Sequence, residues 1–274
     1  MMSPSQHDID IQNAEFWNEL CGSGLARSLG ITEPSPQNLL RFDEAYFGIY
    51  HYLYDYTRPY ALAHKKTLEI GLGYGTLGQH LVEQGAEYYG LDIATSPTKM
   101  MRYRLTLMNK AKNTLTGSAL AIPYHSDSFD FVYTIGCLHH TGNLSLAVAE
   151  VYRVLKPGGH AIVMLYNRHS FRQLVQVLIE RWRTQWKTRG RWSFAEKVRA
   201  LYDTNAAGQA APHTDYVSPA EARQIFEKFT DIQIDVRNFD AYYLPITRWY
   251  IPREKLLDNV GRILGLDLYI RAQK

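Results

Sequence analysis

Three glycines at alternating positions follow a short apolar segment and precede a helical one. This arrangement constrains the fold more than any other feature of the chain. The segment reads Leu68-Glu69-Ile70-Gly71-Leu72-Gly73-Tyr74-Gly75-Thr76. Glycine has no Cβ, so it lets the backbone turn tightly and approach a ligand closely. A turn between a strand and a helix is also the place where an open parallel sheet binds ligands.

Apolar strand-like segments alternate with helical ones through the middle of the chain. We expect strands at Thr67–Ile70, Tyr88–Ile93, Thr114–Ser118, Phe129–Ile135 and Ala161–Tyr166. We expect helices at about Leu77–Gln84 and at Leu144–Leu155, the second of which is ended by Lys156-Pro157-Gly158-Gly159. Between them we expect a helix that begins with Ser96 as its cap and Pro97 at its first helical position. Continuous apolar strands separated by helices indicate a parallel sheet covered on both faces. The sequence therefore predicts an α/β fold with a doubly wound sheet.

The flanking segments differ from this middle part. Residues 10–62 read as helical, with a Glu-Pro-Ser-Pro break at 33–36, and Phe16, Trp17 and Leu20 share one helical face. Later segments predict a basic helical region at 170–204, a loop at 205–215, a helix at Pro219–Phe229, and strands at Asp231–Val236 and Leu268–Arg271. We expect an N-terminal helical lid at 1–62 and a ligand-binding domain at 63–274, with a helical cap insertion at about 170–215.

Composition places the chain among ordinary globular proteins. It has 274 residues, of which 46% are hydrophobic, so it can bury a full core without cross-links. Its two cysteines, Cys21 and Cys137, form no CxxC pair, which excludes a disulfide framework. The N-terminus lacks the apolar core of a signal peptide, and no apolar stretch is long enough to cross a bilayer. We expect a cytoplasmic protein that does not enter a membrane.

Positive charge is concentrated in one region. Residues 168–199 carry nine Lys/Arg and two acidic residues, and tryptophans alternate with the basic residues at 181–192. Such a helix can contact RNA, anionic lipid or an acidic substrate. Alternatively it is a solvated helix whose tryptophans pack on the domain or on a second copy in a homodimer. Because the patch is short and the net charge is only +3, we favour packing and a substrate-enclosing role over nucleic-acid binding.

An acidic residue completes the glycine turn. Asp92 ends the second expected strand, 19 residues after Gly73, where a carboxylate can accept hydrogen bonds from both hydroxyls of a ribose. A dinucleotide fingerprint starting at Gly71 would need a sixth-position glycine, but Thr76 stands there. The pattern is instead ExGxGxG, and Glu69 suits a ligand with an ammonium group better than one with a further phosphate.

Four landmarks occur in order between residues 65 and 166. They are Glu69–Gly75, Gly90-Leu91-Asp92, Ser126–Tyr133 and Glu150–Gly159. This segment resembles the class I S-adenosylmethionine-dependent methyltransferases. The resemblance implies a Rossmann-like sheet of seven strands, six parallel and one antiparallel, with the Asp231 and Leu268 segments as the last two. It implies S-adenosyl-L-methionine as cofactor and S-adenosyl-L-homocysteine as product.

The resemblance also implies the residues that hold the cofactor. Gly71, Gly73 and Gly75 would pass under its methionine part, near Glu69, with Ile135 and Gly136 beside them. Asp92 would bind the ribose hydroxyls and Ile93 would lie beside the adenine. Where the family often has Gly-Asp-Ala near the adenine amino group, this chain has Gly117-Ser118-Ala119. Ser118 can still accept a hydrogen bond there, although it lacks the charge.

Candidates for the chemistry follow the fourth and fifth strands. His139 and His140 stand where substrate meets cofactor, so either can act as a base, cap a helix or pack in the loop. Asn167 or His169, after Tyr166, can orient a polar group of the substrate, or simply form the loop that starts the next helix. Tyrosines of the lid, Tyr46 and Tyr50 among them, can contact the sulfonium or an organic substrate, or pack on the sheet.

These observations favour methyl transfer to an oxygen or nitrogen of a small organic acceptor. No metal-ligand cluster and no Asp/Asn-Pro-Pro-Tyr motif are present, which argues against catechol-type metal enzymes and against methylation of DNA bases or protein glutamine. The main alternative keeps the cofactor but changes the reaction to cyclisation or aminocarboxypropyl chemistry, which releases methylthioadenosine. An RNA methyltransferase and a non-catalytic cofactor-binding subunit are further alternatives.

Overall fold

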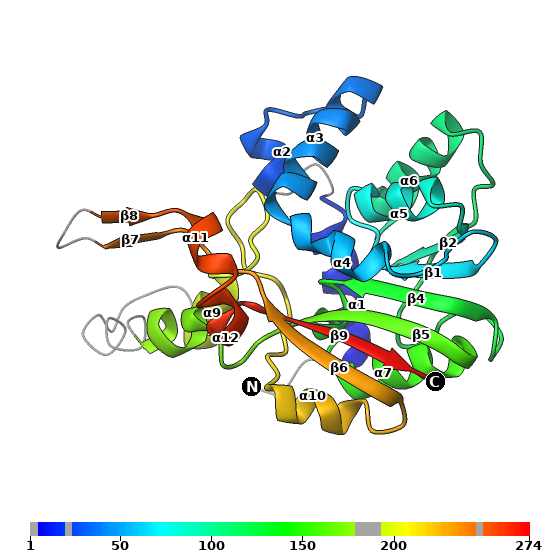
Figure 1. Ribbon diagram of the computed structural model, residues 1–274. Helices are drawn as coiled ribbons and strands as arrows, with labels where there is room; N and C mark the ends of the chain where they lie inside the picture. The colour runs from blue at the N-terminus through cyan, green and yellow to red at the C-terminus, as the bar shows by residue number, and fades with distance from the viewer. Residues whose placement is uncertain (1–4, 20–23, 179–192, 245–248) are drawn as a thin grey trace.

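A computed structural model describes residues 5–19, 24–178, 193–244 and 249–274 of the chain. Its centre is a seven-stranded sheet in the order β3-β2-β1-β4-β5-β9-β6 (Figure 1). The strands are β1 (Lys66–Ile70), β2 (Glu87–Asp92), β3 (Thr114–Thr116), β4 (Phe129–Ile135), β5 (Leu155–Tyr166), β6 (Thr230–Arg237) and β9 (Asp267–Gln273). Only β9 among these seven runs antiparallel to its neighbours, which confirms the predicted arrangement of six parallel strands and one antiparallel strand.

Helices cover both faces of the sheet. Those before β1 are α1 (Gln6–Trp17), α2 (Gly24–Ser28), α3 (Pro36–Ile49), η2 (His51–Leu53) and α4 (Tyr54–Thr57). Those between and after the strands are α5 (Thr76–Glu83), α6 (Thr95–Leu107), η3 (Leu138–His140), α7 (Leu144–Val154), η4 (Arg172–Gln176), α9 (Phe194–Ala200), α10 (Pro219–Ile225), α11 (Arg253–Leu257) and α12 (Gly261–Leu264).

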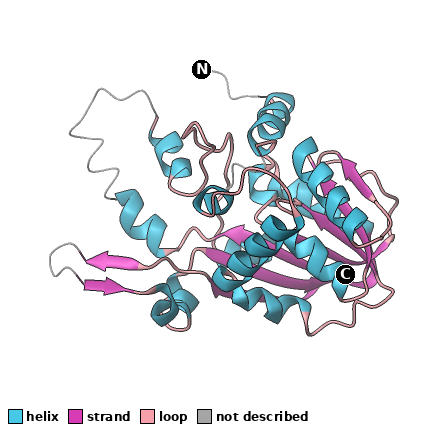
Figure 2. Cartoon of the chain, turned by 90° about the horizontal axis from the view of Figure 1, so that it is seen from above, coloured by secondary structure: helices cyan, strands magenta, loops and turns pink. Residues whose placement is uncertain are grey.

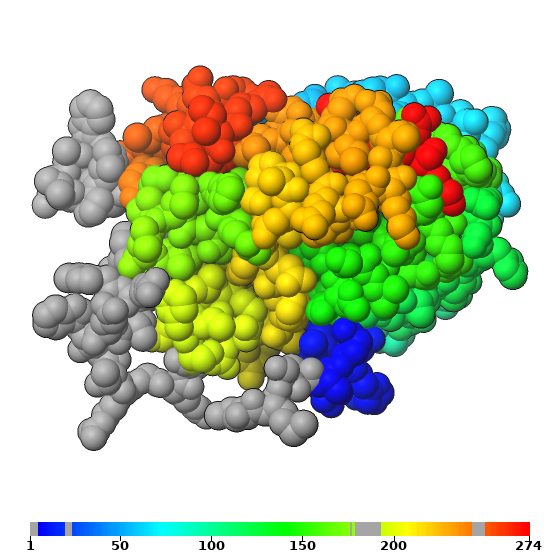
Figure 3. Space-filling model, turned by 90° about the horizontal axis from the view of Figure 1, so that it is seen from below, coloured from blue at the N-terminus to red at the C-terminus, as the bar shows by residue number. Residues whose placement is uncertain are grey.

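Two hydrophobic clusters hold these layers together. One joins a face of the sheet to α7 and α10, the helices that close the face seen in Figure 3. The other joins the opposite face to α4, α5, α6 and α11. Burial on both faces explains why β1, with Leu68 and Ile70 fully enclosed, reads as a continuous apolar run.

The start of β5 differs from the prediction. The helix before it ends at Val154, and the strand begins at Leu155 instead of Ala161. Pairing with β4 jumps from Phe129–Leu155 to Phe131–His160, so the Lys-Pro-Gly-Gly segment forms a bulge within the strand. The C-terminal end of β9 stabilises this bulge, because Gly158 and Gly159 exchange backbone hydrogen bonds with Lys274.

The predicted cap of α6 is also wrong. The helix begins at Thr95, and Ser96 lies inside its first turn. The free Ser96 N–H instead donates to the Asn18 side chain just after α1, at 2.8 Å. A capping group from a distant segment leaves no signal in the local sequence. The helix predicted at Pro219–Phe229 is likewise shorter and ends at Ile225.

The C-terminal third carries a hairpin that the sequence did not suggest. Strands β7 (Tyr242–Leu244) and β8 (Trp249–Ile251) pair antiparallel and protrude from the edge at which the parallel strands end (Figure 1 and Figure 2). The predicted basic helical region is described only in part, as η4 and α9, and its Arg/Trp stretch at 181–192 lies outside the described residues. No helix in the described part of the chain is long and apolar enough to cross a membrane.

Candidate active site

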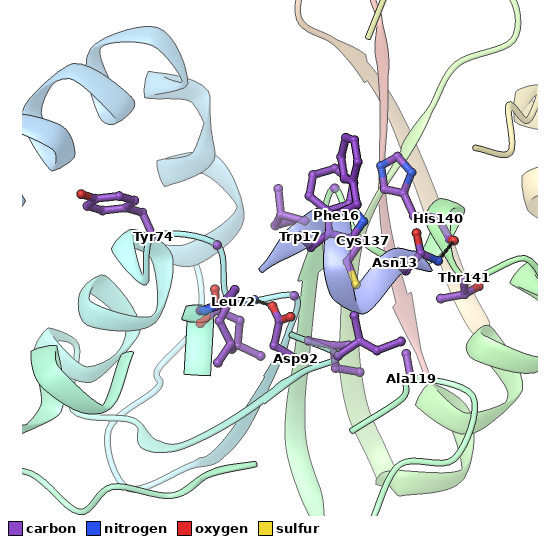
Figure 4. Close-up of a pocket in the computed structure, with 18 of the residues that line it drawn as sticks. Asn13, Phe16, Trp17, Leu72, Tyr74, Asp92, Ala119, Cys137, His140 and Thr141 are labelled. Atoms are coloured by element: carbon purple, nitrogen blue, oxygen red, sulfur yellow. Dashed lines mark hydrogen bonds between the residues drawn. The ribbon is translucent and has the colours of Figure 1, made fainter. Parts of the chain in front are cut away.

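A cavity of about 320 Å³ opens at the carboxyl ends of β1, β2 and β4. One wall, the cofactor side, comes from the turn after β1, the end of β2, the segment 117–119 and the end of β4. The facing wall, the closing side, comes from α1, α3, His140 and the segment 204–205. Figure 4 shows Tyr74 on one side of the cavity and His140 on the other, with Trp17 between them.

The three glycines of the turn serve different purposes. Gly71 and Gly73 line the cavity, as predicted, but Gly75 does not. A Cβ on Gly71 would lie 2.5 Å from Cys137 Cβ, so this glycine lets β1 and β4 end close together. A Cβ on Gly75 would lie 2.9 Å from Arg104 Cδ. Gly75 therefore makes room for an arginine side chain, and its place under the ligand stays a prediction.

That arginine ties the turn to α3. Arg104 is fully buried and forms a bidentate pair with Asp43 of α3, at 2.7 and 2.8 Å. It also donates to the Tyr74 carbonyl oxygen inside the turn at 2.7 Å. Asp43 in turn accepts from the Thr76 hydroxyl at 2.6 Å. This network fixes the glycine turn and α3 relative to each other.

Asp92 has the environment expected of a hydroxyl acceptor. Its side chain is buried and points toward Leu72 (Figure 4). Its two carboxylate oxygens accept the backbone N–H groups of Leu72 and Ala94, each at 2.8 Å. A carboxylate oxygen has two lone pairs, so both oxygens retain capacity to accept from a ligand. Burial raises the pKa of Asp92 to about 6, although the two backbone hydrogen bonds act in the opposite direction and lower it.

Glu69 lies deeper on the cofactor side. Its carboxylate accepts the Tyr88 hydroxyl at 2.5 Å and still lines the cavity. Burial raises the pKa of Glu69 to about 8, although Tyr88 and Arg104 act in the opposite direction. A cationic ligand group nearby would favour the charged form, so Glu69 is suited to an ammonium group.

The remaining residues predicted for the cofactor lie together in the same wall. They are Ile93, Ser118, Ala119, Ile135 and Gly136. Cys137 joins them, and burial raises the pKa of its thiol to about 12, which keeps it neutral and unreactive.

Helix α1, which lies within the segment predicted as a lid, supplies a wall whose individual residues the prediction did not name. Asn13, Phe16 and Trp17 line the cavity. Asn13 anchors the helix by donating to the His140 carbonyl oxygen at 2.7 Å. The shared face of Phe16 and Trp17 was visible in the sequence, but nothing local indicated what that face covers.

The two histidines have different positions. His140 lines the cavity, and its ring lies 4.8 Å from that of Trp17. His139 is fully buried behind it and packs on Tyr166 at 4.1 Å between ring centres. Burial lowers the pKa of both imidazoles, so both are neutral at physiological pH. Of the two histidines, only His140 lines the cavity.

Hydrogen bonding fixes the tautomer of His140. Its Nδ1 lies 2.8 Å from the His213 carbonyl oxygen, an acceptor, so Nδ1 carries the proton and Nε2 the lone pair. Nε2 has no hydrogen-bond partner among the described residues, and its nearest carboxylate is Asp203, at 3.6 Å. A free lone pair beside a carboxylate is an arrangement that accepts a proton.

The other residues predicted for substrate binding also differ in whether they line the cavity. Tyr46 lines the cavity, whereas Tyr50, Tyr166, Asn167 and His169 do not. The Asn167 side chain joins its own loop, donating to the Gly265 carbonyl and accepting from the His169 N–H. His169 is exposed on the outer surface.

The charged side chains among the described residues that line the cavity are all acidic. Four carboxylates line it, on Asp10, Glu19, Glu69 and Asp92, and none of its described lining residues is Lys or Arg. Within the described ranges no group of three His, Cys, Asp or Glu side chains could hold a metal ion. The wall therefore lacks the side chains that usually bind phosphate or carboxylate groups.

A doubly wound sheet with a glycine turn and an acid at the ends of β1 and β2 defines a nucleoside-binding α/β protein. Comparison with known proteins makes this class more specific. A family model described as "Methyltransferase domain" matches residues 68–163. The chain is 25% identical over 188 residues to a ubiquinone biosynthesis O-methyltransferase of Thiobacillus denitrificans, a match covering 68% of this chain and 79% of that protein.

Two further matches show the range of similar proteins. Phosphoethanolamine N-methyltransferase 2 of Caenorhabditis elegans is 26% identical over 104 residues, which cover 37% of this chain and 24% of that protein. A crystal structure of a SAM-dependent methyltransferase from Archaeoglobus fulgidus has the same fold, with a TM-score of 0.52 and 18% identity, covering 81% of this chain and 91% of that one. The domain at residues 68–163 and the fold of the chain are thus those of an S-adenosylmethionine-dependent methyltransferase.

The residues present fit this cofactor. The same cavity is lined by an acid suited to an ammonium group, Glu69, and by an acid that retains free acceptor capacity, Asp92. Ile93, Ala119 and Gly136 add apolar surface to this wall. When bound, S-adenosylmethionine supplies the methyl group, and the protein supplies alignment and exclusion of water.

Proposed function

We propose that this protein transfers the methyl group of S-adenosylmethionine to an oxygen or nitrogen of a small organic acceptor that is neutral or positively charged. The observation that carries the proposal is the wall facing the cofactor side. It is aromatic and acidic, and its described residues include no Lys or Arg. An acceptor with a phosphate or carboxylate near its reacting atom would find repulsion there instead of a partner.

The cofactor side performs binding. We assign the ribose hydroxyls to Asp92, the ammonium group to Glu69, and the adenine to the wall formed by Ile93, Ser118 and Ala119. Gly71 and Gly73 allow the backbone to approach the methionine part. This assignment rests on the shared cavity wall and on the free lone pairs of Asp92.

The closing side performs alignment and proton removal. Phe16, Trp17 and Tyr46 narrow the space beside the transferable methyl group and exclude water. An oxygen nucleophile must lose a proton, and His140 Nε2 is the base we assign to it. An amine in its neutral form needs no base before it attacks, so the same site accommodates nitrogen acceptors.

A panel assay tests this proposal. The purified protein is incubated with S-adenosylmethionine and matched phenols, primary amines and carboxylic acids, and S-adenosylhomocysteine and methylthioadenosine are quantified by mass spectrometry. We expect S-adenosylhomocysteine to form only with a phenol or an amine. Accumulation of methylthioadenosine above the protein-free control would contradict the proposal and favour cyclisation or aminocarboxypropyl chemistry.

An RNA arm of the same assay tests the remaining catalytic alternative. Methylation of total RNA that weakens steeply with salt, in the absence of small-molecule turnover, would replace the small acceptor with a nucleic acid.

A further inference from the structure

Helix α1 is anchored near both of its ends to parts of the fold that line the cavity. At its start, the Gln6 side-chain amide donates to the carbonyl oxygen of Thr141, which lines the cavity, at 2.7 Å. Just beyond its end, the Asn18 side-chain oxygen accepts the N–H of Ser96 at 2.8 Å, next to the lining residue Pro97. The side chains of α1 that face the cavity are therefore held in place relative to the sheet.

The cavity-facing side of this helix carries an acid. Asp10, Asn13 and Trp17 share one helical face by their spacing, and all three line the cavity. The other acids of α1 do not line it, because Asp8 belongs to the capping box at the helix start and Glu15 is exposed to solvent. Asp10 is therefore the acid that α1 presents to a ligand in the cavity.

Asp10 keeps one carboxylate oxygen free. Its Oδ1 accepts from the Gln6 side-chain amide at 2.8 Å, and no described residue forms a hydrogen bond or ion pair with its Oδ2. Glu19, the other acid of the closing side, is engaged, because it accepts the Ala206 N–H at 2.8 Å and lies 3.6 Å from Arg27. Of these two acids, Asp10 has the greater capacity to accept a hydrogen bond from a ligand.

The wall that we assign to the adenine has no acid of its own. It consists of Ile93, Ser118 and Ala119, and Ser118 stands where class I methyltransferases often have an aspartate. The Ser118 hydroxyl oxygen already accepts the Leu120 N–H at 3.2 Å. An adenine carries an amino group with two N–H donors, and donors enclosed in a cavity need acceptors. The cofactor side therefore lacks a strong acceptor for this amino group.

Asp10 lies at the end of the cavity that the adenine wall forms. One nitrogen, the Gln6 side-chain amide, contacts both the Asp10 carboxylate and the Thr141 carbonyl oxygen, which places Asp10 beside Thr141. Figure 4 shows Thr141 and Ala119 on the same side of Asp92, with Tyr74 on the opposite side. A nucleoside whose ribose is held by Asp92 and whose base lies along Ala119 thus extends toward Asp10.

We propose that Asp10 binds the 6-amino group of the cofactor's adenine through its free oxygen. This inference rests on the proposed function, which places the adenine beside Ile93, Ser118 and Ala119. A hydrogen bond from an N–H group to a carboxylate is charge-assisted and stronger than one to a serine hydroxyl. Helix α1 is then part of the cofactor site, and it supplies from the closing side the acid that the segment after β3 lacks.

Two ligands that differ in one group test this assignment. They are S-adenosylhomocysteine and its deamino analogue, in which hydrogen replaces the 6-amino group, and calorimetry measures the affinity of each. We expect the wild-type protein to bind S-adenosylhomocysteine about tenfold or more tightly than the analogue, because only the former makes the charge-assisted hydrogen bond. In Asp10→Ala this preference should disappear, through loss of S-adenosylhomocysteine affinity, while the affinity for the analogue changes little.

Two further variants of α1 provide the matched comparison. Glu15→Ala removes an exposed acid of the same helix and should leave both affinities unchanged. Gln6→Ala removes the anchor to Thr141 but keeps the Asp10 carboxylate, so it should weaken both ligands by the same factor and preserve the preference. If Asp10 only helped to dock the helix, Asp10→Ala would behave like Gln6→Ala.

The outcomes separate this inference from the proposed function. If the wild-type protein binds neither ligand, the proposed function fails first. If it binds both equally well, or if Asp10→Ala retains the wild-type preference, the role of Asp10 is wrong. A preference that survives in Asp10→Ala but is lost in Ser118→Ala would assign the amino group to Ser118 instead. Binding of the analogue by Asp10→Ala shows at the same time that the variant has folded.

Discussion

The cofactor side and the closing side of the cavity are built by different means. The cofactor side comes from the segments that follow β1, β2, β3 and β4, where Asp92 accepts two backbone N–H groups and Gly71 comes close to Cys137. The closing side comes from side chains of α1 and α3, from His140 and from the segment 204–205. A wall made of turns leaves a pattern in the sequence, whereas a wall assembled from distant side chains does not.

The Asp43–Arg104 pair joins the two sides and should give the largest effect on stability. Arg104→Met leaves the half-buried Asp43 carboxylate without its cation, and removing one partner of a largely buried pair costs about 3 kcal/mol. Urea denaturation measures the loss. The double variant Arg104→Met/Asp43→Leu should recover part of it, since both charges are then gone. A loss below about 1 kcal/mol for Arg104→Met would show that the two sides are held together by other contacts.

His140 tests whether the closing side acts in catalysis. With a phenol acceptor identified by the panel assay, His140→Ala should lower kcat about 100-fold or more, because the proton acceptor is lost. His139→Ala should change kcat much less, and neither variant should alter cofactor affinity in calorimetry. Equal loss of kcat in both variants would assign His140 to packing.

Asp92 tests the cofactor side in isolation. Asp92→Ala should weaken S-adenosylmethionine binding by about 1–3 kcal/mol, since ribose hydroxyls and two backbone N–H groups lose their acceptor. Calorimetry measures this loss, and Asp267→Asn, at a buried acid that does not line the cavity, serves as the control. Unchanged affinity in Asp92→Ala would remove the ribose assignment.

The dependence of the free energy of unfolding on pH reports on the buried acids, and we expect it to be the smallest of these effects. Folding raises the pKa of Glu69 from 4.5 to about 8 and that of Asp267 from 3.8 to about 7. The folded state then binds protons more tightly than the unfolded state, so these groups make the free energy of unfolding fall as pH rises toward 8. The buried histidines act in the opposite sense, but only below their ordinary pKa of 6.5.

Between pH 7 and pH 8 the change of the unfolding free energy with pH therefore comes mainly from Glu69. Denaturation of the ligand-free protein should show stability falling across this window, and Glu69→Gln should flatten the fall. Asp267→Asn should flatten the profile nearer pH 7. A wild-type slope retained in Glu69→Gln would show that this carboxyl is already ionised when the protein folds.

The elements were predicted well where periodicity and turn chemistry agree. The parallel part of the sheet and the choice of Asp92 follow from runs of apolar residues and from spacing, whereas the antiparallel strand and Ile93 came from the family resemblance. The prediction was wrong at Ser96, because the helix begins one residue earlier and the Ser96 N–H itself donates to Asn18 from another segment. At Gly75 nothing in the sequence indicated that the glycine makes room for Arg104, because such a glycine looks the same in sequence as one that makes room for a ligand.

The sequence by itself determined the fold class, the cofactor and the position of the cofactor side, because each depends on residues close together in the chain. Only the tertiary structure decided which of the two histidines lines the cavity and which residues of α1 do so. Those relations join residues more than a hundred positions apart, such as Asn13 and His140. Local propensity carries no information about them, since they exist only once the sheet has packed against both helical layers.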